Sequence, residues 1–229
     1  MNVGIVGTGN MGRALGLGWA RAGHPVLFGS ADPGKAAAVV AAGTDSTRAG
    51  DLDAAAAFGD VILYTVRDVL PSALLRNHRV LDGKIVIDCR NSAILGLEVP
   101  DPDNRPGVHF TTPVPSIAER LAADVPEARV VKAFNTVPSI VIELGREALA
   151  PHRISIFLCS DDPASKSVVR SLAEQLGFVG IDSGELERSR LVEAVADFIR
   201  YQTVATGMGM GPLTTISIRR LDDASDASG

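Results

Sequence analysis

The chain has 229 residues, a length that suits one large domain or one large domain with a small companion. A net charge of −5 and an aromatic content of 4% provide neither the basic surface nor the stacking platforms of a nucleic-acid binder, and a hydrophobic content of 46% is too high for a disordered chain. The sequence has no long uncharged apolar run and no basic segment near Met1, so we expect a cytoplasmic protein without a membrane span or a signal peptide.

Short runs rich in Val and Ile alternate with helical segments along the chain. Runs of this kind, polar only at their ends, are typical of strands buried on both faces of a parallel sheet. We expect strands at residues 2–6, 25–29, 61–66, 84–89, 129–135, 154–159 and 179–181. We expect helices at residues 13–22, 33–42, 52–58, 116–123, 163–176 and 187–205, and one after Pro138. The alternation predicts an α/β fold, a doubly wound Rossmann-type parallel sheet with a small C-terminal α/β domain.

Local signals set several boundaries. Asp32, followed by Pro33, and Asp51 each stand where a helix N-cap is expected, and the Pro- and Asp-rich stretch 100–107 predicts a surface loop. We expect three parts, which are a dinucleotide-binding domain at 1–128, a smaller domain that completes the cofactor cleft at 129–218 and a disordered tail at 219–229.

The two cysteines, Cys89 and Cys159, lie in strand-like runs, which predicts buried free thiols. The chain has no CxxC pair and its four histidines are scattered, so we expect no metal site.

A glycine-rich loop follows the first strand. Its residues Gly7-Thr8-Gly9-Asn10-Met11-Gly12 match G-x-G-x-x-G, between a strand and a helix, which is the context that gives this motif its meaning. The first glycine allows a tight turn, the second lets backbone approach a pyrophosphate, and the third lets helix and strand pack closely. The helix N-terminus then presents free N–H groups to the anion. This loop predicts a dinucleotide site.

The end of the second strand indicates which dinucleotide binds. Enzymes that use NAD place an acidic residue there to bind the ribose 2′-hydroxyl, whereas this chain has Gly29-Ser30-Ala31. Ser30 can donate to a 2′-phosphate, Lys35 can supply positive charge and Thr8 can add a hydroxyl. We therefore predict NADP(H), with a plain solvated helix residue as the alternative for Lys35.

The glycine loop, Gly29-Ser30 and the segment 132–136 (Lys-Ala-Phe-Asn-Thr) together resemble the NADPH-dependent coenzyme F420 reductase family, also called F420-dependent NADP oxidoreductase. Further matches are 184–186, 189–193 and 207–209, so the resemblance runs from Met1 to about residue 218. Two positions depart from the family pattern. Ala31 stands where members that use NADP often have Arg, and Asn135, which cannot titrate, stands where some archaeal members have His.

The resemblance implies hydride exchange between NADP(H) and the 5-deazaflavin coenzyme F420, a small C-terminal domain and a homodimer. It also implies that the deazaflavin stacks beside the segment 135–139, with Met208 near the cleft. The chain has no nucleophile–base–acid motif, which fits a reaction in which cofactors carry the chemistry and the protein supplies orientation. Asn135 and Pro138 are therefore candidate catalytic residues through positioning alone.

The candidate cofactor-binding residues share the carboxyl edge of the expected sheet, the second helix or the deazaflavin cleft; they are Gly7, Thr8, Gly9, Asn10, Met11, Gly12, Ser30, Lys35, Thr65, Val66, Arg67, Asn135, Val137 and Met208. Core packing is the alternative for Val66, a helix start for Pro138 and gap filling for Met208. Two other functions stay open. One is an NADPH-dependent reductase of an imine or ketone, with Tyr64 or Asp88 as proton donor, and the other is a non-enzymatic NADPH sensor.

Overall fold

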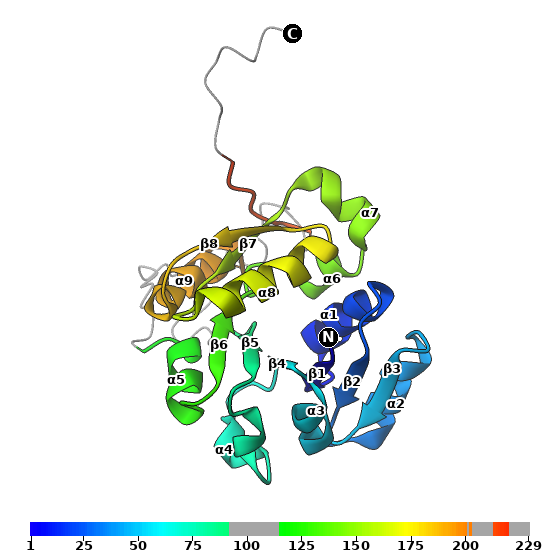
Figure 1. Cartoon of the computed structure of the whole chain (residues 1–229). Helices are drawn as coiled ribbons and strands as arrows, with labels where there is room; N and C mark the ends of the chain where they lie inside the picture. Colours follow the sequence, from blue (N-terminus) through cyan, green and yellow to red (C-terminus); the bar gives the residue numbers. More distant parts are fainter. Residues whose placement is uncertain (92–114, 201, 203–212, 220–229) are drawn as a thin grey trace, which may run out of the picture.

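The computed structural model describes residues 1–91, 115–200, 202 and 213–219 (Figure 1). The loop expected at 100–107, Met208 and nearly all of the expected tail at 219–229 lie outside these residues. Within the described part, none of the helices combines the length and the apolar composition needed to cross a bilayer.

Six parallel strands form the central sheet, in the order β3-β2-β1-β4-β5-β6. They are β1 (Val3–Val6), β2 (Val26–Gly29), β3 (Thr47–Gly50), β4 (Val61–Tyr64), β5 (Ile85–Asp88) and β6 (Arg129–Lys132). Every residue of β1, β4 and β5 is buried, as expected of strands covered on both faces. The strand order reverses between β1 and β4, which confirms the doubly wound Rossmann-type sheet.

Helices cover both faces of this sheet, because successive side chains of each strand point to opposite sides. Ile5, Leu63 and Ile87 belong to one apolar cluster, and Tyr64 and Val86 belong to the other. The first cluster includes side chains of α1 (Asn10–Arg21), α2 (Pro33–Ala41), α6 (Ser139–Ile142) and α8 (Pro163–Gln175). The second includes side chains of α3 (Leu52–Phe58), α4 (Pro71–Leu74), η1 (His78–Leu81) and α5 (Ile117–Asp124).

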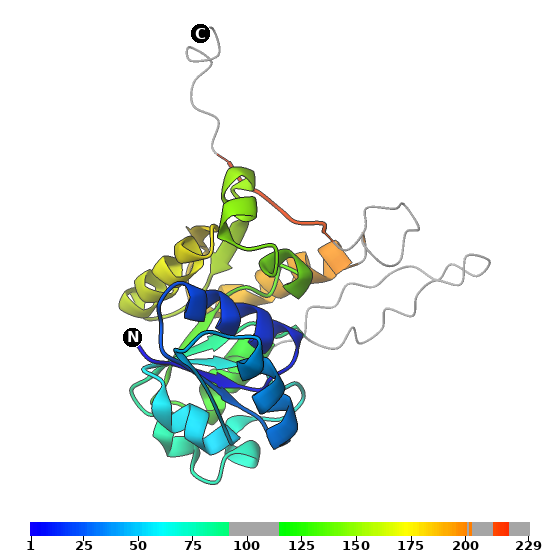
Figure 2. The ribbon, with the colours of Figure 1, turned by 90° about the vertical axis from the view of Figure 1, so that its right-hand side faces the viewer.

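A smaller α/β unit follows β6. Its parallel strands β7 (Ser155–Leu158) and β8 (Val179–Asp182) pair with each other. α7 (Arg146–Leu149) and η2 (Ala150–His152) precede β7, α8 connects the two strands, and η3 (Leu186–Arg188) and α9 (Ser189–Arg200) follow β8. Two backbone hydrogen bonds, of 2.9 and 3.2 Å, join Lys132 to Cys159 and so connect the two sheets. Figures 1 and 2 show this unit beyond the ends of β5 and β6.

The expected elements occur in the expected order. β3 and the short helices α4, η1, α7 and η2 were not expected, and β6 ends at Lys132 where a strand to residue 135 was expected. Because β6 pairs with β5, a division of the chain before residue 129 would separate a strand from its sheet. We therefore propose the boundary after Lys132. Cys89 and Cys159 are buried free thiols, as predicted.

Candidate cofactor-binding site

The glycine loop passes tightly under the end of β4. Gly7 has a φ of 107°, a conformation that only glycine adopts easily, and a Cβ there would lie 2.5 Å from Thr65 Oγ1. A Cβ on Gly12 would overlap the carbonyl oxygen of Gly7, whereas a Cβ on Gly9 would meet nothing within 4 Å. Two glycines are thus required by the protein itself. The third leaves open space of the kind that a closely approaching ligand fills.

Helix α1 begins directly at this open space. Gly9 is its N-cap, so no side chain caps the first N–H groups, and no acidic residue lies in the first turn. Thr8, Asn10 and Met11 are partly or fully exposed around the loop. A helix N-terminus of this kind carries partial positive charge and free donors, which suits the pyrophosphate of a dinucleotide.

The end of β4 supports the glycine loop from across the point between β1 and β4 where the strand order reverses, which is the switch point of the sheet. Thr65 Oγ1 lies 2.9 Å from the Gly7 carbonyl oxygen and 3.2 Å from that of Val6, so its hydroxyl holds the loop in place. Val66 is half-buried against the α3 side of the sheet, and Arg67 is exposed beyond it. Thr65 therefore has a positioning role, and Arg67 is the residue of this segment that is free to reach a ligand.

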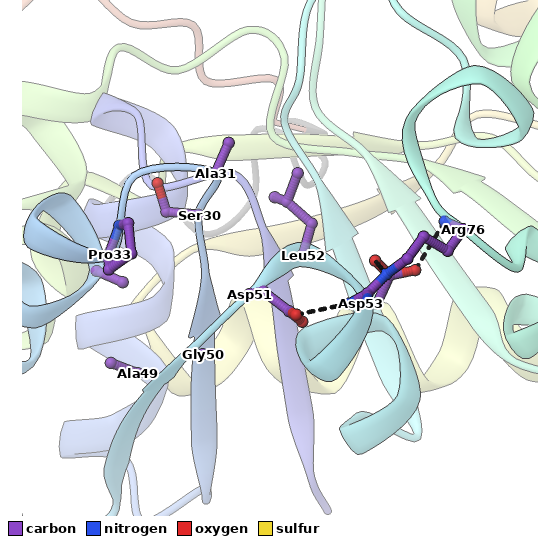
Figure 3. A pocket seen from close by; sticks show the side chains of 10 residues that line it. Ser30, Ala31, Pro33, Ala49, Gly50, Asp51, Leu52, Asp53 and Arg76 are labelled. Carbon is purple, nitrogen blue, oxygen red and sulfur yellow. Dashed lines mark hydrogen bonds and ion pairs between the residues drawn. The ribbon is translucent and has the colours of Figure 1, made fainter.

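A pocket of about 490 Å³ lies at the carboxyl ends of β2 and β3 (Figure 3). Ser30 and Ala31 line it, whereas Lys35 is exposed on α2 and is not among the lining residues. Ser30 Oγ accepts from the Asp32 N–H at 3.1 Å, which leaves the hydroxyl proton for a ligand. Asp32 caps α2 as predicted, because its carboxylate accepts from Gly34 and Lys35.

The opposite side of this pocket holds charged residues that sequence reasoning missed. Asp51 follows β3 and is brought beside Ser30 by the pairing of β2 with β3, through a 3.2 Å bond from Ser30 N to Gly50 O. Arg76 comes from the segment between α4 and η1 and contacts both Asp51 and Asp53. The end of β2 carries no carboxylate, but the pocket still contains one, because Asp51 directly follows β3.

A buried charged cluster occupies the same edge of the sheet at β5 and β6. Lys132 Nζ lies 3.2 Å from Asp88 Oδ2 and 2.7 Å from Glu193 Oε1 on α9, and Arg90 Nε lies 2.6 Å from Asp88 Oδ1. All four side chains are at most 4% exposed. Burial alone raises the pKa of Asp88, but the charges of Lys132 and Arg90 outweigh it and hold that pKa below its ordinary value.

This cluster bears on the proton donors considered for an imine or ketone reductase. Asp88 is ionised and fully buried, so it has no proton to deliver. Tyr64 is also fully buried; its hydroxyl donates to the Val69 carbonyl oxygen at 2.8 Å, and burial raises its pKa. The geometry therefore places neither residue as a general acid.

Asn135 lies at the carboxyl edge, just past β6, and connects three elements. Its Nδ2 donates to Asn91 Oδ1 at 2.9 Å and to the Val192 carbonyl oxygen of α9 at 3.1 Å. In the described part of the chain, Asn135 Oδ1, Thr136 Oγ1 and Arg90 Nη2 are buried without a hydrogen-bond partner. Unsatisfied buried groups are rare in native proteins, so their concentration at one edge marks that edge as incomplete without water or a ligand.

The remaining predicted residues divide between edge and core. Val137 is buried in the apolar cluster that includes side chains of α1 and α8, and Pro138 directly precedes α6, which agrees with the helix-start alternative. Met208 lies outside the described residues. Among the described residues, no group of three or more His, Cys, Asp or Glu side chains could hold a metal ion.

The doubly wound sheet and the open glycine cradle define a Rossmann-type protein, and comparisons with known proteins give its family. Residues 2–92 match the family model described as NADP oxidoreductase coenzyme F420-dependent. The F420-dependent NADP reductase of Methanothermobacter thermautotrophicus is 31% identical over 211 residues, which cover 85% of each chain. The protein belongs to this family.

Two further similarities differ in what they cover. The human metalloreductase STEAP2 is 28% identical over 193 residues, which are 84% of this chain but only 35% of that protein, so the chain spans about a third of that relative. A crystal structure described as an F420-dependent NADP reductase from Arthrobacter sp. FB24 matches 96% of this chain and 100% of its own, with a TM-score of 0.75 and 23% identity. That likeness supports the Rossmann-like fold.

Proposed function

We propose that this enzyme transfers a hydride between NADP(H) and coenzyme F420. The observation that carries the proposal is the extent of the similarity to the Methanothermobacter reductase, which covers 85% of both chains and therefore extends into the smaller unit, beyond the residues 2–92 that match the family model. The geometry of the described residues is consistent with it at both ends of a dinucleotide.

The glycine loop would bind the pyrophosphate. Gly9 leaves the space, and the N-terminus of α1 supplies free N–H donors and partial positive charge. Ser30 and the pocket beyond it would take the adenosine end, because they lie at the carboxyl edge next to the switch point between β1 and β4.

The ends of β4, β5 and β6 would take the nicotinamide end. NADP(H), when bound, supplies or accepts the hydride there. The chain's part is to orient and to exclude water. Asn135 fixes the loop after β6 against Asn91 and α9, and the buried cluster around Lys132 keeps these elements in register. Alignment of the reactants alone can lower a barrier by about 7–11 kcal/mol, so orientation is a substantial contribution from this edge.

The test is to mix the purified protein with NADPH and oxidised F420 and to follow the loss of deazaflavin absorbance. We expect turnover, and transfer of deuterium from labelled NADPH to the deazaflavin. No turnover at any pH, with NADPH binding intact, would exclude F420 as the acceptor.

Gly9→Ala and Gly12→Ala make a matched pair for this assay. The Gly9 methyl group would enter open space, so this variant should fold normally and lose NADPH affinity. The Gly12 methyl group would overlap the Gly7 carbonyl oxygen, so this variant should lose stability. If Gly9→Ala binds NADPH as tightly as the unmodified protein does, the cradle is not the pyrophosphate site.

We also propose a cytoplasmic homodimer. The free buried thiols of Cys89 and Cys159 suit a reducing compartment. Leu191 and Phe198, on the outer face of α9, are 63% and 51% exposed, and an exposed apolar helix face suits an interface between two copies. Light scattering after gel filtration should give twice the mass of one chain, and Leu191→Lys should lower it. A single-chain mass for the unmodified protein would contradict the homodimer.

A further inference from the structure

The pocket between β2 and β3 carries an arginine that neither the glycine motif nor the serine at the end of β2 predicts. Arg76 is held by three hydrogen bonds, from its N–H and Nε to Asp53 at 2.8 and 2.9 Å and from Nη2 to Asp51 at 2.7 Å. In the described part of the chain its third guanidinium nitrogen, Nη1, has no hydrogen-bond partner. The side chain is 77% exposed, so it is positioned but remains open to a ligand.

The placement of this arginine matters because the pocket also contains negative charge. Asp51 lies beside Ser30 across the β2–β3 pair, and its carboxylate is 56% exposed. In the NAD pattern, a carboxylate at the end of the second strand accepts from a ribose hydroxyl and would repel a phosphate, and Asp51 brings the same charge to the pocket from the end of β3. In this pocket Arg76 forms ion pairs with Asp51 and Asp53, so a cation lies on the opposite side of the pocket from Ser30 (Figure 3).

The two cations near this end of the site differ in how they are held. Lys35 is exposed on α2 outside the lining of the pocket, and a lysine of this kind is a flexible point charge. Arg76 lines the pocket, and its planar guanidinium is oriented by two carboxylates, which lowers the entropy lost when it binds an anion. Ala31, which has no charge, adds nothing to phosphate binding.

We propose that Arg76 is the residue that makes this pocket accept 2′-phosphorylated adenosine. It does so by neutralising Asp51 and by donating from Nη1 to the phosphate, while the Ser30 hydroxyl donates from the other side. Asp51 thereby becomes a specificity determinant whose effect depends on Arg76. The inference rests on the proposed NADP(H) site and names the residues that select the cofactor within it.

The test is calorimetric binding of two adenosine fragments, 2′,5′-ADP and 5′-AMP, which differ only in the 2′-phosphate. Arg76→Ala should weaken 2′,5′-ADP by about tenfold and change 5′-AMP by less than about twofold, because a charge-assisted hydrogen bond is lost and Asp51 is exposed. Arg79→Ala is the matched control, since Arg79 is equally exposed at 76%, pairs with Asp82 and does not line the pocket. It should leave both affinities unchanged.

Asp51→Asn keeps the proposal testable if Arg76→Ala folds poorly. Arg76 retains its contacts with Asp53 in this variant, and the pocket loses one negative charge, so 2′,5′-ADP should bind a few times more tightly with 5′-AMP unchanged. The double variant should recover part of the loss caused by Arg76→Ala. A purely structural role for Arg76 would change both fragments alike.

Three results would overturn the proposal. They are an equal effect of Arg76→Ala on the two fragments, no effect on either, and weaker 2′,5′-ADP binding in Asp51→Asn. The fragments contain neither nicotinamide nor deazaflavin. A failed turnover assay with F420 therefore leaves this test intact, and failure of this test leaves the turnover assay intact.

Discussion

The carboxyl edge of the sheet carries two groups of ion pairs, each with one cation between two carboxylates, in opposite surroundings. At β5 and β6, Lys132 joins Asp88 and Glu193 in a site with no more than 2% exposure of any of the three side chains. Past the ends of β2 and β3, Arg76 joins Asp51 and Asp53, and the side chains of these three residues are 77%, 56% and 28% exposed, in that order. A buried pair that loses one partner leaves an unsolvated charge, whereas water replaces an exposed partner. The first group therefore holds the structure together, and the second is free to take part in binding.

The largest expected effect is that of Lys132→Met. The substitution leaves Asp88 and Glu193 without their shared cation, and breaking a buried pair costs about 3–5 kcal/mol of unfolding free energy. Urea unfolding followed by circular dichroism measures it. Lys35→Met, at an exposed position on α2, is the control and should stay within about 0.5 kcal/mol of the unmodified protein. Equal losses in both variants would remove the contrast between buried and exposed charges.

A smaller effect is expected for Glu193→Gln. The amide keeps the shape of the side chain, but it weakens the bond to Lys132 and the contacts with the Ile117 N–H at 3.1 and 3.3 Å. We expect a loss of about 2 kcal/mol in the same unfolding experiment. Asp53→Asn, which weakens the exposed partner of Arg76, should lose less than about 1 kcal/mol. The reverse order would show that burial does not decide the strength of these pairs.

The Glu119 side chain is 18% exposed, which is between the exposures of the two groups, and its ion pair with Arg190 gives a pH-dependent test. Hydrogen bonds from Arg190, at 2.5 and 2.8 Å, and from Ser116 hold the pKa of Glu119 at about 2. Because this pKa lies below the unfolded value of about 4.3, the stabilisation is present in full above that pH and is lost as the pH falls toward about 2.

Glu119→Gln should therefore lower the unfolding free energy by about 1–2 kcal/mol at pH 7, and the difference should shrink as the pH falls below about 4. Unfolding curves measured from pH 7 to acid pH, with Glu127→Gln at an exposed position as the control, check the direction. A difference that grows toward acid pH would contradict this assignment.

The smallest expected effect on stability is that of Arg76→Ala. Its ion pairs are exposed, so thermal unfolding should show little or no change in the midpoint, although binding of 2′-phosphorylated adenosine should fall. A loss as large as that of Lys132→Met would show that Arg76 is needed for folding and would end the distinction between the two groups.

The expectations that held were those decided by local chemistry. The buried strands followed from runs of Val and Ile, and the caps at Asp32 and Asp51 followed from an acidic side chain placed before a helix. β3 was missed because its residues Thr-Arg-Ala-Gly are polar or small and lie at the sheet edge, where only one of the four is fully buried. The expected extension of β6 to residue 135 failed at Phe134, whose φ of 62° cannot continue a strand.

By itself, the sequence determined the alternation of strands and helices and the glycine-rich turn, because both depend on residues that are neighbours in the chain. Only the tertiary structure decided which charges meet. Arg76 reaches Asp51 across 25 residues, and Lys132 reaches Glu193 across 61. Neither pairing has a local signal, because strand order and helix packing bring these residues together. The buried pairing of Lys132 stabilises the fold, whereas the pairing of Arg76 remains exposed to solvent.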